Sequence, residues 1–107
     1  MGMLISTMSA YSTLHPEANP ALSGQNIYNN EELVNKQIYR LIGTMPTICA
    51  NAYRFRMGRS FNPPDTKQGY IENFLGMLDR IGNESIKVHP IVVKIFEVLF
   101  ILHADHE

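Results

Sequence analysis

The sequence predicts an all-α protein, and three observations carry that prediction. Apolar residues recur at spacings of three and four in three segments, which is the period of an amphipathic helix. Clusters of proline, glycine and asparagine separate these segments and mark loops. The remaining apolar segment, residues 91–102, is longer than a typical strand, which rarely exceeds about ten residues. We therefore expect four main helices in one domain with a modest core, because the chain has 107 residues.

The first helix is expected over residues 3–14. Small serine, threonine and alanine side chains alternate with its apolar residues, so a neighbouring helix could approach it closely. No capping residue precedes Met1, which suggests that the helix has lost its start. Residues 15–30 are expected to form a loop, because Pro16, Pro20 and Gly24 interrupt helical pairing. The apolar residues of this first helix are Met3, Leu4, Ile5, Met8, Tyr11 and Leu14.

The second helix is expected over residues 30–57. Asn29 is the expected N-cap, and Glu32 would complete a capping box three residues later. Pro46 lacks an amide hydrogen and clashes with the preceding turn, so we expect a kink there. Gly58 suits the left-handed conformation that ends many helices. The expected apolar face comprises Leu33, Val34, Gln37, Ile38, Leu41, Ile42 and Met45.

Two further helices are expected in the second half of the chain. A short one covers residues 69–80 and ends at Gly82 and Asn83, and its expected inner face is Tyr70, Phe74, Leu75 and Leu78. The last begins at Pro90, a favoured first helical position, with His89 before it. Because this last helix is apolar on most sides, it should be buried on most sides. We therefore expect it, and the first helix, to pack against further chain or a second copy.

Composition narrows the function classes. The net charge of −1 favours neither nucleic acid nor an anionic membrane as a partner. Arg54, Arg56 and Arg59 are expected to be a solvated helix end. Cys49 is the only cysteine, which excludes an intramolecular disulfide and suits a reducing compartment. Residues 1–14 lack the features of a signal peptide, and the apolar segment 91–102 is too short to span a bilayer.

The last five residues, His103-Ala104-Asp105-His106-Glu107, form the densest cluster of ionisable groups. On a helix, His103 and His106 would share a face one turn apart. Three interpretations remain open: metal ligation, which lacks a recognised ligand spacing; structural histidines at a helix end; and binding of an anionic substrate. No helix stop signal follows Glu107, so the chain is expected to be cut there.

Several segments together resemble the citrate synthase family. Residues 100–107, FILHADHE, resemble the family's ILHADHE motif; residues 40–47, RLIGTMPT, resemble its RL(I/L)xxMPT helix; and residues 73–78, NFLGML, resemble its NFLxM segment. Val88-His89-Pro90 stands where members carry Val-Asn-Pro. The resemblance covers essentially the whole chain in order. Ala104 and the MPT segment are more similar to the bacterial type than to the mitochondrial one.

The resemblance implies an acyltransferase of the tricarboxylic acid cycle. Such enzymes are all-α and condense oxaloacetate with acetyl-CoA and water to give citrate and CoA. Residues 1–107 would be the middle of the large domain, without the small domain or the downstream catalytic motifs. His106 would bind oxaloacetate and citrate, with His103 supporting it. The resemblance implies no catalytic residue and no metal in this segment, and no cofactor beyond acetyl-CoA as a substrate. Arg40 matches a basic position of an allosteric NADH site, although Thr44 stands where a lysine is common.

The resemblance also implies partners and rivals. The first two helices would build the interface of a homodimer or a higher homo-oligomer, with no nucleic acid and no membrane as partners. A cytoplasmic location is expected, with the mitochondrial matrix or another organelle as the alternative. The chain alone is expected to be inactive. Two rival functions remain: 2-methylcitrate synthase, which accepts propionyl-CoA, and a non-catalytic helical interaction module derived from this fold.

Overall fold

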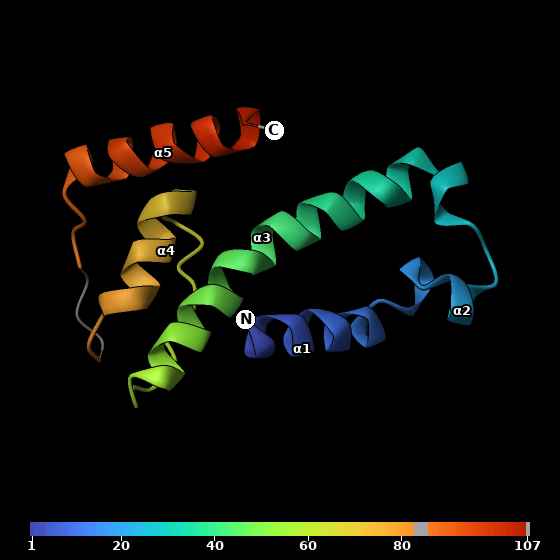
Figure 1. The fold of residues 1–107 in the computed structure, drawn as a ribbon, viewed down its shortest axis with the longest axis horizontal. Helices are drawn as coiled ribbons and strands as arrows, with labels where there is room; N and C mark the ends of the chain where they lie inside the picture. The colour runs from blue at the N-terminus through green and yellow to red at the C-terminus, as the bar shows by residue number, and fades with distance from the viewer. Residues whose placement is uncertain (83–85, 107) are drawn as a thin grey trace. The chain divides into compact units, whose positions relative to one another are not determined.

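The computed structural model describes residues 1–82 and 86–106, and the described residues contain helices and no strand (Figure 1). The helices are α1 (Gly2–Tyr11), α2 (Pro20–Ser23), α3 (Glu31–Arg56), α4 (Tyr70–Asp79) and α5 (Pro90–Asp105). The all-α prediction and its four main helices are confirmed, with the four-residue α2 as an addition. The chain divides into two compact units, Met1–Ala52 and Tyr53–Glu107, which we describe separately.

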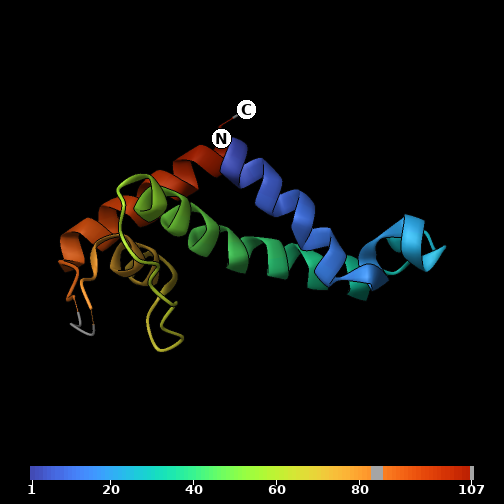
Figure 2. The same cartoon turned by 90° about the horizontal axis from the view of Figure 1, so that it is seen from below.

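In the first unit, α1 has no buried residue. Its hydroxyls turn back on the helix, with Thr7 Oγ1 donating to the Met3 carbonyl at 2.8 Å and Ser9 Oγ donating to the Ile5 carbonyl at 2.9 Å. Near the end of α1, Thr44 Oγ1 of α3 donates to Tyr11 Oη at 3.2 Å. Figure 2 shows α1 approaching α3 toward this end. The small side chains of α1 therefore remain open to a further partner.

The expected loop of residues 15–30 is wrong in detail, because it contains α2 and two 3₁₀ turns, Pro16–Ala18 and Ile27–Asn29. Pro16 and Pro20 begin helical turns instead of breaking them, since the first turn of a helix needs no proline amide hydrogen. The side chain of Asn19 caps α2 by accepting from the Ala21 amide at 3.0 Å. Gly24, with φ of +66°, ends α2.

The N-cap of α3 is Asn30, not Asn29 as expected. Asn30 Oδ1 accepts from the Leu33 amide at 3.1 Å, whereas Asn29 belongs to the preceding 3₁₀ turn. The helix continues through Pro46 without interruption, so the expected kink stays a prediction. At the other end, Gly58 has φ of +67° and the Arg59 amide donates to the Arg54 carbonyl at 2.9 Å. This pattern confirms the expected glycine stop.

In the second unit, Arg54 contradicts the expected solvated helix end, because it is only 4% exposed. Its Nε donates to the Ser60 carbonyl and its Nη1 donates to the Leu78 carbonyl at 2.8 Å. Asn62, 6% exposed, donates from Nδ2 to the Met77 carbonyl at 3.0 Å and to the Arg80 carbonyl at 2.8 Å. The end of α4 is therefore held by two buried polar side chains from outside that helix.

The inner face of α4 also differs from the expectation. Ile71, Gly76 and Met77 are buried, whereas Tyr70 is 45% exposed and Phe74, Leu75 and Leu78 are half-buried. The loop that carries Asn62 bonds to the Met77 carbonyl, so the covered face extends to Met77 beyond the stripe read from spacing alone. Glu72 Oε2 accepts from the Gly69 amide at 2.9 Å, as a first-turn carboxylate should. The expected stop at Asn83 lies outside the described residues.

Helix α5 begins as expected, and its surface is exposed within this chain, so its packing against further chain or a second copy stays a prediction. His89 Nδ1 accepts from the Ile91 amide at 3.2 Å, and Pro90 occupies the first turn. No residue of α5 is buried within this chain. Its packing partner is α4, through Tyr70 and Phe100, whose ring centroids lie 6.5 Å apart. Among the described residues, no helix combines the length and the apolarity needed to cross a membrane.

Candidate functional site

The C-terminal hollow, which we define by its lining residues Leu102, His103 and His106, brings the two predicted histidines together. It is an open depression of about 410 Å³. His103 lies in the last turn of α5, whereas His106 follows the helix. The His106 amide donates to the Leu102 carbonyl at 3.2 Å, and its φ of −87° and ψ of +118° turn the backbone into an extended conformation. The two side chains therefore line one surface from different backbone geometries.

The two imidazoles differ in their hydrogen bonding. His103 Nδ1 lies 2.8 Å from the Leu99 carbonyl oxygen of its own helix. Within residues 1–82 and 86–106, no hydrogen bond reaches the ring of His106, which is exposed. His106 is thus able to engage a ligand with either ring nitrogen. Asp105 is also exposed, and Glu107 lies outside the described residues.

Metal ligation finds no support in the part of the chain that the structure describes. No group of three or more histidine, cysteine, aspartate or glutamate side chains is arranged there to hold a metal ion. Cys49 is a half-buried free thiol on α3. Asp65 accepts from the Lys67 amide at 3.0 Å, which is a turn-forming contact. Among the described residues, Cys49 and Asp65 therefore belong to no metal-binding cluster.

Arg40 lies elsewhere, in the first unit, and already has an anionic partner. Its Nη1 donates to Glu17 Oε1 at 2.6 Å, and this hydrogen bond is the largest cause that lowers the pKa of the Glu17 carboxyl. His15 Nδ1 lies 3.7 Å from the same carboxylate oxygen, and the His15 ring meets Tyr11 edge-on at 4.8 Å. The guanidinium of Arg40 is thus engaged within the chain.

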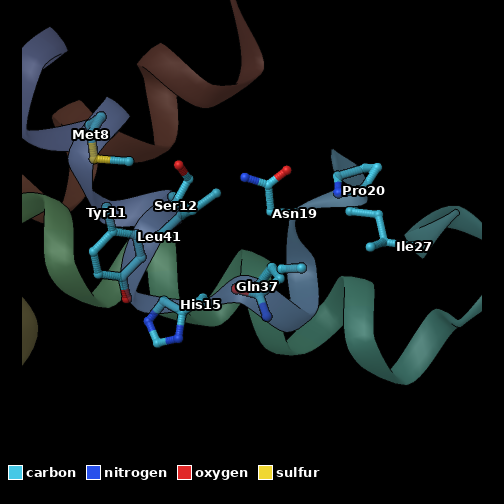
Figure 3. Close-up of a pocket in the computed structure, with 10 residues that line it drawn as sticks. Met8, Tyr11, Ser12, His15, Asn19, Pro20, Ile27, Gln37 and Leu41 are labelled. Carbon is cyan, nitrogen blue, oxygen red and sulfur yellow. The ribbon is translucent and has the colours of Figure 1, made fainter. Parts of the chain in front are cut away.

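A hollow of about 350 Å³ lies beside Tyr11 and His15, and it is mainly apolar (Figure 3). Arg40 is not one of its lining residues. The predicted nucleotide position and this hollow are therefore separate features of the first unit. The lining residues are Met8, Tyr11, Ser12, His15, Ala18, Asn19, Pro20, Ile27, Gln37 and Leu41.

Arg54 and Asn62 are the structurally important polar residues that sequence reasoning missed. Both side chains donate hydrogen bonds to backbone carbonyls of α4, which are distant in the sequence. No local sequence pattern predicts such long-range hydrogen bonds. The buried fraction of Arg54 could have been suspected only from its place in the last turn of α3, where it follows the buried Ala50 by one helical turn.

Comparison with known proteins identifies one family over the whole length of the chain. Residues 1–107 match the family model described as citrate synthase, C-terminal domain. Over all of its residues the chain is 56% identical to a citrate synthase and 54% identical to a peroxisomal citrate synthase, both from Dictyostelium discoideum. It is 50% identical to a glyoxysomal citrate synthase from Cucurbita maxima. It covers 21%, 22% and 21% of these three proteins, so it spans about a fifth of the length of the curated relatives it matches. The chain belongs to the citrate synthase family.

Proposed function

We propose that this chain acts as part of a citrate synthase, which condenses oxaloacetate with acetyl-CoA and water to give citrate and CoA. The observation that carries the proposal is the pair His103 and His106 lining one hollow at the end of α5. The family match over residues 1–107 and the relatives named citrate synthase support it.

In this proposal His106 binds oxaloacetate and then citrate. Its ring is exposed, borders the hollow, and has no hydrogen bond within the described residues. An imidazole in that position can donate a hydrogen bond to a carboxylate or carbonyl oxygen of a dicarboxylic keto acid. His103 borders the same hollow and supports His106.

The catalytic acid and base groups are proposed to lie in the remaining length of the enzyme. Removal of a methyl proton from acetyl-CoA and polarisation of a ketone need several groups held together in a near-attack geometry. The 107 residues contain neither a GPxHG nor a GxGH motif. We therefore expect no CoA release from oxaloacetate and acetyl-CoA by this chain alone.

The test is steady-state kinetics of the intact enzyme. His106→Ala is expected to raise the KM for oxaloacetate at least about tenfold, since a hydrogen bond to a charged group contributes about 1.5–3 kcal/mol. His89→Asn is the matched control, because it replaces a histidine 17 positions away on the opposite end of α5 and keeps an acceptor for the Ile91 amide. An unchanged oxaloacetate dependence in His106→Ala would refute the assignment.

The acyl donor needs its own comparison. A relative from Aspergillus oryzae, 41% identical over 108 residues, is named citrate synthase-like protein oryE. The family thus includes proteins whose names leave the reaction open, and 2-methylcitrate synthase remains the alternative. Turnover on acetyl-CoA should exceed turnover on propionyl-CoA. The reverse order would assign the alternative.

A homodimer or higher homo-oligomer is the proposed assembly. On α1, Met3 and Ile5 are exposed, and on α3, Ile38, Leu41 and Ile42 are exposed. Surfaces of this kind are typical of interfaces. Analytical ultracentrifugation should give at least twice the monomer mass. An associating but inactive intact protein would favour the non-catalytic interaction module instead.

Two finer points belong to the same proposal. Relatives named peroxisomal and glyoxysomal support a peroxisomal location in preference to the cytoplasm, which a fluorescent fusion would test. These relatives come from slime mould and plants, so the bacterial-type branch stays a prediction. Arg40 as a nucleotide contact also stays a prediction: NADH would have to compete with Glu17 for this guanidinium.

A further inference from the structure

The backbone of α5 determines which ring nitrogen of a neutral His103 donates a hydrogen bond and which one accepts. Its Nδ1 lies 2.8 Å from the carbonyl oxygen of Leu99, four residues earlier. Because a carbonyl oxygen only accepts, the proton of a neutral His103 must sit on Nδ1. The other ring nitrogen, Nε2, then has a lone pair and accepts hydrogen bonds. Over residues 1–82 and 86–106, no hydrogen bond reaches Nε2.

The two histidines of the C-terminal hollow therefore offer different chemistry. His106 has no such bond to the backbone, so either of its ring nitrogens can donate. Neutral His103 presents an acceptor. An ionised carboxylate and a ketone oxygen also only accept, so neither suits Nε2 of His103. A hydroxyl group can donate to it.

We propose that His103 is a specificity residue for the hydroxyl group of the product, with Nε2 accepting a hydrogen bond from the tertiary hydroxyl of citrate. This inference rests on the proposed function. Oxaloacetate has a ketone at the carbon that bears the hydroxyl in citrate, so it offers His103 no donor. His103 thus distinguishes the hydroxy acid from the keto acid, while His106 binds groups common to both.

The test uses the intact enzyme and two ligands, citrate and tricarballylate. Tricarballylate has the same three carboxylates as citrate and lacks the hydroxyl. The key variant is His103→Asn, whose amide nitrogen can replace Nδ1 as the donor to the Leu99 carbonyl but which has nothing at the Nε2 position. We expect the Kd for citrate to rise about fivefold to tenfold, the value of one net hydrogen bond. The Kd for tricarballylate should change by less than about twofold.

Equal weakening of both ligands, or unchanged citrate binding, would overturn the role of His103. If His103→Asn does not fold, His103→Gln replaces it, because its amide oxygen can reach the Nε2 position and should preserve the preference for citrate over tricarballylate. Loss of that preference in His103→Gln would also overturn the inference. A wild-type enzyme that releases no CoA from oxaloacetate and acetyl-CoA would refute the proposed function, whereas an active enzyme with equal weakening refutes the His103 role alone.

Discussion

The segment around α4 and the helix α5 differ in how far their side chains are buried within this chain. Around α4, Ile71 and Met77 are buried, and Arg54 and Asn62 satisfy carbonyl groups in the interior. In α5 no residue is buried, although most of its residues are large and apolar. The first segment is thus stabilised by contacts within this chain.

The difference has a functional meaning. Helix α5 carries His103 and is followed directly by His106, and its apolar surface is available for packing that this chain does not provide. A buried apolar side chain contributes about 1.5–3 kcal/mol relative to an exposed one. The position of His106 should therefore depend on chain or partner outside residues 1–107, whereas the α4 segment should not.

Loss of Arg54 should produce the largest effect on stability. Arg54→Ala leaves the carbonyls of Ser60 and Leu78 without their donor in a buried place, so we expect a loss of about 4 kcal/mol in the free energy of unfolding. Urea denaturation of the 107-residue chain measures this. The control is Arg56→Ala on the same helix, which is exposed and should change stability by less than about 0.5 kcal/mol. Similar losses in both variants would contradict a buried anchor.

Met77 should come next. It is 2% exposed, so Met77→Ala should cost about 3 kcal/mol through lost burial and a residual cavity. Met57→Ala is the matched control, because Met57 is 51% exposed. A Met77 variant as stable as the Met57 variant would show that the α4 segment lacks the core described above.

The ends of the helices could largely be predicted from the sequence. Local signals located Gly58, His89 and Pro90 correctly, because helix stops and starts depend on nearby residues. Asn29 was one position off, since Asn30 beside it has the same capping chemistry. Helix ends of this kind can be predicted to within about one position, because they depend on neighbouring residues.

Contacts between distant positions could not be predicted. Arg54 donates to a carbonyl 24 residues away and Asn62 to one 15 residues away, and no sequence pattern specifies such pairs. For the same reason spacing alone misplaced the inner face of α4. The histidines of the hollow were found from their cluster at residues 103–107, and the resemblance of the motif implied their role. The bond of His103 to Leu99 required coordinates.

A polar substitution on α5 should separate this chain from the intact enzyme. Ile95 is 52% exposed, so Ile95→Gln should change the unfolding free energy of the 107-residue chain by less than about 0.5 kcal/mol. In the intact enzyme we expect a cost of about 2 kcal/mol, because the same side chain would be buried. Thermal unfolding of both proteins measures the difference. Equal small effects would mean that α5 stays exposed there.

The smallest effect is expected at the ion pair between Glu17, which is exposed, and Arg40, which is half-buried on α3. The hydrogen bond from Arg40 lowers the pKa of Glu17 below its ordinary value of 4.5. The stabilisation is therefore present above pH 4.5 and is lost as the pH falls through the lower value in the folded chain. Glu17→Gln should make the pH dependence of unfolding shallower below pH 4.5 and leave stability at pH 7 nearly unchanged, since exposed ion pairs contribute little. Acid titrations of stability for the two chains measure this slope. A large loss at pH 7 would place this pair among the buried anchors and remove the contrast with Arg54.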